Sequence, residues 1–152
     1  MEPPPLPLDL RAIERILPHR RPFLLVDRVT ELEPDRRIVG IKHVAADERY
    51  LVETSRGAVL PPMILMEAVA QVGAIMVLGK PENRLKLAFF MGIEKARFRR
   101  PARVGDVVVI EAIVRRLGSR MGVFDGTAAV EGVTVAEGAM TFALGEAPAL
   151  TR

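Results

Sequence analysis

The sequence predicts an α+β protein in which an antiparallel sheet wraps around one long central helix. One short helix and two strands come first, a long apolar helix follows, and three or four further strands complete the chain. Because helices do not alternate with strands, this order disfavours a doubly wound parallel sheet. The long helix is apolar nearly all round, so most of its faces must be covered. One sheet covers about one face, and we therefore expect a second subunit to cover more.

The chain begins with a proline-rich stretch and a short helix. Residues 1–8 are predicted to form a tail, residues 9–146 a single domain and residues 147–152 a second tail. The short helix has Asp9 as its N-cap, because an aspartate there can accept a hydrogen bond from the first turn. Its apolar residues recur at helical spacing, and Pro18 ends it.

Two strands are predicted next, over residues 23–32 and 37–45, with a turn at Glu33–Asp35 between them. Residues 46–60 have no clear period, and we predict a loop there.

The long helix has signals at both of its ends. Pro61 and Pro62 suit a first helical turn, where a backbone donor is not missed. Gly79 follows the last apolar turn and Pro81 lies beyond it, so the helix is predicted to end at about Leu78.

The C-terminal half is predicted to consist of strands. They cover residues 85–100, 106–117, 121–132 and 133–144, with Gly92 as a bulge or bend inside the first of them.

Composition excludes several classes of protein. The 152 residues are 49% hydrophobic and 27% charged, which is ordinary for a globular chain, and the absence of cysteine excludes thiolate chemistry. Aromatic residues make up only 5% and no nucleic-acid motif is present, so the net charge of +3 does not indicate nucleic-acid binding. The apolar run 58–79 contains Glu67 and two prolines, which disfavours a membrane span. No secretory signal pattern is visible, so the cytoplasm is the expected compartment.

Glu67 is the residue in this apolar run whose presence needs a physical explanation. A lone carboxylate in a buried helix is costly unless it has a partner or a function. Gln71 lies one turn on and shares its helical face. Two interpretations stay open: a structural carboxylate at a dimer interface, or a residue of an altered active site.

Four segments, in the right order and at the right distances, resemble one known family. They read ILPHRRPFLLVDRV, EAVAQ, ARFRRPARVGD and VAEGAMTFAL, and the match runs from about Ile13 to Leu144. They resemble the hotdog-fold 3-hydroxyacyl-(acyl carrier protein) dehydratases of bacterial fatty acid synthesis. The resemblance implies a curved sheet around a central helix and active sites shared across a homodimer, often assembled as a trimer of dimers. It also implies acyl carrier protein or coenzyme A thioesters as substrates, with neither cofactor nor metal.

The chemistry of that family needs two side chains. A histidine in a Gly-His-Phe-Pro loop acts as base and acid, and a helix glutamate from the other subunit helps the hydroxyl leave as water, because elimination needs both proton transfers. By this resemblance Glu67 is the candidate catalytic residue. The candidate substrate-binding residues are Pro62, Met63, Gln71 and Phe90.

The sequence departs from the family at the histidine. Counted back from Glu67 without gaps, its place is Glu53, and with one deletion it is Thr54. The only histidines are His19 and His43, which we interpret as structural or surface residues. Glu53 could supply a second carboxylate if the loop folds as in the family.

A second departure concerns the start of the helix. In the family a glycine N–H there polarises the thioester carbonyl, and its place is taken by Pro62, which has no N–H. Met63 N–H could still donate, so the donor site would be shifted.

Three functions therefore compete. The first is a dehydratase-like protein that binds acyl thioesters, with its elimination activity impaired or lost. The second is an acyl thioesterase that uses Glu67, and the third is a non-catalytic subunit of a hetero-oligomeric dehydratase. The basic run Arg97–Arg103 is either a solvated strand end or a docking site for an acidic carrier protein.

Overall fold

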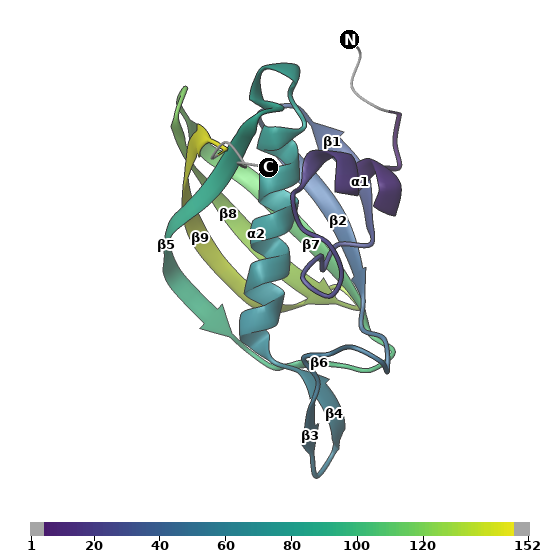
Figure 1. The fold of residues 1–152 in the computed structure, drawn as a ribbon. Helices are drawn as coiled ribbons and strands as arrows, with labels where there is room; N and C mark the ends of the chain where they lie inside the picture. Colours follow the sequence, from purple (N-terminus) through teal and green to yellow (C-terminus); the bar gives the residue numbers. More distant parts are fainter. Residues whose placement is uncertain (1–4, 148–152) are drawn as a thin grey trace.

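The long apolar helix is the centre of the molecule, and a sheet curves around it (Figure 1). A computed structural model describes residues 5–147. Helix α2 spans Pro62–Leu78, with Pro61 as its N-cap and Gly79 as its C-cap, so both predicted ends of this helix are confirmed. Its residues from Leu65 to Leu78 are buried with the exception of Glu67.

Six antiparallel strands form the main sheet, in the order β1-β2-β7-β8-β9-β5. Their bounds are β1 Arg28–Glu33, β2 Arg37–His43, β7 Val107–Leu117, β8 Met121–Val130, β9 Val133–Glu146 and β5 Lys86–Phe98. The predicted bulge at Gly92 is present, since the β5–β9 register shifts between Phe90 and Gly92.

Close contact between α2 and the sheet depends on small residues. A side chain at Gly73 of α2 would overlap the ring of Phe124 on β8, and one at Gly126 would overlap Val69. Every second residue of β8 is buried, as the two-residue period of a strand requires. The glycines thus let the helix lie directly on the strands.

The other faces of α2 are covered by the same chain. Helix α1 (Leu10–Ile16) lies beside it, and the loop after α1 runs along its middle (Figure 1). The predicted cap is confirmed, because the Asp9 side chain accepts a hydrogen bond of 2.8 Å from Ala12 N. Within one chain α1, this loop and β5 already bury most of α2. The expectation that a second subunit covers more of this helix stays a prediction.

Two predicted segments differ in the structure. Residues 46–60, predicted as a loop, contain a hairpin of β3 (Val52–Thr54) and β4 (Gly57–Leu60) that joins β6 (Ala102–Arg103) in a small second sheet. The hairpin projects past the start of α2 (Figure 1), and β3 is exposed throughout, so it has no apolar alternation to detect. The first strand begins at Arg28 and not at residue 23.

The predicted tails are only partly within the described residues. Residues 1–4 and 148–152 lie outside them, so the tail predictions there stay predictions. Leu8 is 1% exposed and exchanges two backbone hydrogen bonds with Val29, of 2.9 and 3.0 Å. The chain is therefore anchored to the sheet from Leu8 onward.

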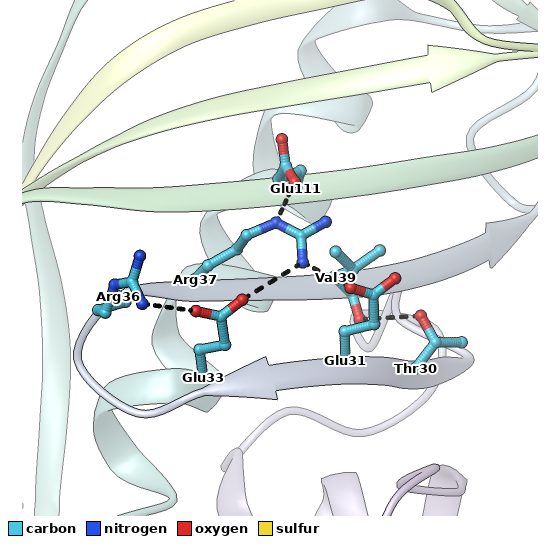
Figure 2. Close-up of polar contacts among 7 residues, drawn as sticks. All are labelled: Thr30, Glu31, Glu33, Arg36, Arg37, Val39 and Glu111. Carbon is cyan, nitrogen blue, oxygen red and sulfur yellow. Dashed lines mark hydrogen bonds and ion pairs between the residues drawn. The ribbon is translucent and has the colours of Figure 1, made fainter.

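A charge cluster ties β1, β2 and β7 together at one end of the sheet (Figure 2). Arg37 on β2 contacts Glu31 and Glu33 of β1 at 2.5 and 3.9 Å and also binds Glu111 of β7. The hydrogen bonds to Glu31 and Glu111 raise the pKa of the Arg37 guanidinium. Because arginine is cationic well below its ordinary pKa, this contribution is fully present at neutral pH and would be lost only at extreme alkalinity.

The arrangement is the hotdog fold, in which an antiparallel sheet wraps around a central helix, and the α+β prediction is confirmed. Among the described helices, none has the length and hydropathy needed to cross a bilayer.

Candidate active site

Glu67 is the exposed residue within the otherwise buried stretch Leu65–Leu78 of α2. Its side chain is 48% exposed, although its neighbours Met66 and Ala68 are buried. Glu67 Oε1 accepts a hydrogen bond of 2.9 Å from Gln71 Nε2, one helical turn away. The carboxylate therefore has a partner and still reaches the surface of a cavity.

Gln71 is a buried polar side chain, 1% exposed, whose orientation is fixed by its contacts. Its Oε1 accepts a hydrogen bond of 2.9 Å from Leu25 N, so the amide nitrogen must face the two acceptors, Phe23 O at 2.8 Å and Glu67. This amide connects α2 with the loop that follows α1. It also directs Leu25 N to a side chain and not to another strand, which fits the start of β1 at Arg28 and not at residue 23.

His19 comes from the same loop and lies next to Glu67. The distance from His19 Nε2 to Glu67 Oε1 is 3.8 Å, and the two side chains are 33% and 48% exposed. His19 Nδ1 is buried and has no hydrogen-bond partner among the described residues. The loop backbone is held by Arg20, whose Nη1 donates to Leu17 O at 2.9 Å and to His19 O at 2.7 Å.

A cavity of about 160 Å³ opens beside these residues. One face of α2 forms its floor, and the loop and the start of β5 form its sides; its lining is Leu17, Pro18, His19, Glu67, Gln71, Ala74, Leu78, Leu87, Ala88, Phe89 and Phe90. A dry cavity of roughly 150 Å³ holds a molecule the size of benzene. The space therefore fits a short apolar chain with a carboxylate and an imidazole at its side.

The structure brings some of the predicted site residues together. Glu67, Gln71 and Phe90 line this cavity. Pro62 and Met63 lie in the first turn of α2 and do not line it; Met63 is exposed. The N–H groups of a first turn have no intrahelical acceptor, and Met63 N–H is one of them.

The two positions that count back to the family's histidine lie elsewhere. Glu53 and Thr54 are exposed residues of β3 and do not line the cavity. The Thr54 hydroxyl bonds to Gly57 O at 2.7 Å across the hairpin turn. Within one chain, Glu53 and Glu67 therefore do not share a site.

Sequence reasoning missed the position of His19. His19 and Glu67 are distant in the sequence, and no periodicity relates a loop residue to a helix residue. The buried Gln71 was the available signal, because a buried amide must find partners, and these turned out to be in the His19 loop. The other histidine, His43, lies on β2 with its Nδ1 3.4 Å from Asp27, outside the lining of this cavity.

Strand β5 presents an apolar edge next to the cavity. It is the last strand of the six-stranded sheet, and large apolar side chains along it are exposed: Phe89, Phe90, Met91, Ile93 and Phe98. An edge strand of this kind offers unpaired backbone groups to another chain.

The basic run after β5 is partly neutralised. Arg97 and Arg99 both contact Glu137, at 3.8 and 3.0 Å, and Arg100 lies 3.5 Å from Asp106. Three guanidinium groups thus face two carboxylates, which leaves this surface positive. Within residues 5–147 no three His, Asp or Glu side chains gather in a way that could hold a metal ion.

Fold and site together define a hotdog protein with a carboxylate beside an apolar cavity. The chain belongs to the FabA-like family, whose model, described as a FabA-like domain, matches residues 17–139. It is 46% identical to the 3-hydroxyacyl-(acyl-carrier-protein) dehydratase FabZ of Anoxybacillus flavithermus over 140 residues, 91% of this chain and 99% of the relative. The FabZ of Bacillus subtilis is 44% identical over 140 residues, with the same coverage.

A solved structure shares the fold at lower identity. The dehydratase heterocomplex ApeI:P from Xenorhabdus doucetiae superposes with a TM-score of 0.77 at 20% identity, covering 88% of this chain and 91% of that one.

Proposed function

We propose that this chain binds 3-hydroxyacyl thioesters of an acyl carrier protein or coenzyme A as a cytoplasmic, dehydratase-like hotdog protein, and that its elimination activity is impaired. The observation that carries the proposal is the half-exposed carboxylate of Glu67, which lines an apolar cavity. By the resemblance, Glu67 takes the place of the family's helix glutamate. The FabZ relatives are dehydratases of acyl-carrier-protein substrates, which supports the same substrate class.

Impairment follows from what the chain lacks. Loss of a general base costs roughly a factor of 10²–10⁴ in rate, and loss of an oxyanion donor costs about 10²–10³. The family's loop histidine is replaced at Glu53 or Thr54, and the donor glycine is replaced by Pro62. Such losses need not multiply, but both act on the same reaction.

Assembly is part of this proposal. We infer that the exposed apolar edge of β5 pairs with another hotdog subunit, giving a homodimer or a trimer of dimers. Neither nucleic acid nor membrane is an expected partner.

A second candidate is a hetero-oligomeric dehydratase. A partner that carries the Gly-His-Phe-Pro loop could bring its histidine to Glu67, whose exposed carboxylate would then complete a shared site. The ApeI:P protein from Xenorhabdus doucetiae, which shares the fold, is a dehydratase heterocomplex.

One assay separates these candidates. The purified protein is incubated with 3-hydroxybutyryl and crotonyl thioesters of coenzyme A and of acyl carrier protein, and water elimination or addition and thiol release are both followed. Slow elimination that is lost in Glu67→Gln supports the impaired dehydratase, whereas a rate equal to that of a Bacillus subtilis FabZ control contradicts impairment. Thiol release that depends on Glu67 indicates a thioesterase instead.

The hetero-oligomer has its own readout. Addition of a loop-histidine paralogue from the same genome should raise the elimination rate only when this chain carries Glu67. A rate unchanged by Glu67→Gln in the mixture would exclude the shared site.

A further inference from the structure

We propose that His19 is a positioning residue for Glu67, and that Glu67 is the single acid–base group for the elimination that this chain still performs. The inference rests on the proposed function and concerns the same cavity. Of the described residues that line this cavity, only His19 and Glu67 have titratable side chains. The proton transfers of the reaction must therefore pass through this pair within one chain.

The surroundings of His19 select its tautomer. Nδ1 is buried with no partner among the described residues, whereas Nε2 faces the Glu67 carboxylate. A buried N–H without an acceptor is rarer in proteins than an acceptor without a donor, so the proton of the neutral imidazole belongs on Nε2. In that tautomer His19 is a donor toward Glu67 and has no lone pair there to act as a base.

Glu67 Oε1 then has one donor bound to it and a second donor close by. Gln71 Nε2 donates at 2.9 Å, and His19 Nε2 lies 3.8 Å away, one small movement from hydrogen-bond distance. Catalytic hydrogen bonds are often long without substrate and shorten when it binds. Both donors are tied to the loop after α1. His19 belongs to that loop, and Gln71 donates to Phe23 O and accepts from Leu25 N. Anchoring of Oε1 leaves Oε2 to exchange protons with a substrate.

A single carboxylate can complete the reaction. Glu67 Oε2 takes the proton from C2 of the 3-hydroxyacyl thioester, and the electron pair of that C–H bond forms the C2–C3 double bond as the C3–O bond breaks. The departing hydroxyl takes the proton back from Glu67 and leaves as water. The products are the 2-enoyl thioester and water, and Glu67 returns to its carboxylate form without any co-reactant.

The test compares two substitutions of one residue. His19→Gln keeps an N–H donor at about the reach of Nε2, while His19→Leu keeps bulk but no donor. We expect His19→Leu to lower kcat for 3-hydroxybutyryl-coenzyme A roughly tenfold to a hundredfold, as for loss of a hydrogen bond to a charged group, with KM changed less than about threefold. His19→Gln should stay within about threefold of the wild-type kcat. His43→Leu is the matched control, because His43 lies outside the cavity.

Each outcome of this comparison either supports or overturns the role proposed for His19. If His19→Gln is as slow as His19→Leu while both keep the wild-type melting temperature, His19 transfers the proton itself and the inference is overturned. Equal rates in wild type, His19→Gln and His19→Leu overturn the inference as well, and so does a wild type that shows no turnover. The thioester binding in the proposed function is tested apart from this by calorimetric binding of 3-hydroxybutyryl-coenzyme A to Glu67→Gln, and absence of that binding contradicts the proposed function without bearing on His19.

Discussion

Replacement of Gln71 by leucine tests the link between α2 and the loop that carries His19. Leucine has a similar size but offers no acceptor to Leu25 N, which now donates a hydrogen bond of 2.9 Å to the Gln71 amide oxygen. Leu25 is buried, so its N–H would be left without a partner at a cost of about 1–3 kcal/mol. Phe23 and Glu67 are exposed, and water can replace the amide at both. The orphaned N–H of Leu25 therefore makes the largest contribution to the loss of stability.

We expect Gln71→Leu to lower the free energy of unfolding by about 2 kcal/mol, which corresponds to a melting temperature lower by roughly 4–8 °C for a chain of this length. The measurement is urea unfolding at one fixed protein concentration, because the stability of an oligomer depends on concentration. The midpoint should fall with an unchanged m-value.

The control removes a hydrogen bond from the surface. Thr30→Val deletes the 3.4 Å bond from the hydroxyl of the exposed Thr30 to Val39 O and should change stability by less than about 0.5 kcal/mol (Figure 2). If Gln71→Leu also stays within about 0.5 kcal/mol of wild type, the amide does not hold the loop, and the account of the site is wrong.

Three further predictions concern packing, assembly and docking. Gly73→Ala should destabilise the protein by about 1–3 kcal/mol in urea, because its methyl group overlaps the Phe124 ring, even though alanine favours a helix by about 1 kcal/mol; a more stable variant would contradict this. Ile93→Lys on the exposed edge of β5 should shift the protein toward monomers in sedimentation, and an unchanged mass would exclude pairing through this edge. The pair Arg99→Glu and Arg100→Glu should raise KM for acyl-carrier-protein thioesters at least about threefold but leave KM for coenzyme A thioesters unchanged; an equal rise for both would point to damage at the cavity.

Local signals were enough to predict most of the fold. Proline at the start and glycine at the end of an apolar run gave the bounds of α2, and Asp9 gave the cap of α1. Gly132 has a φ of 77° at the turn from β8 to β9, a conformation in which glycine is favoured, so this turn was also predictable. The β3–β4 hairpin was not, because its short exposed strands carry no apolar period.

The candidate site, like the fold, could be predicted from the sequence only in part. Glu67 could be selected from the sequence, because a carboxylate in an apolar helix has a cost that demands an explanation. That His19 is its neighbour, and that Glu53 is not, depends on how the loop after α1 folds back onto α2. Patterns along the chain report which face of an element is buried. They carry no information on which distant segment covers that face, because the covering contacts form only when the whole chain has packed.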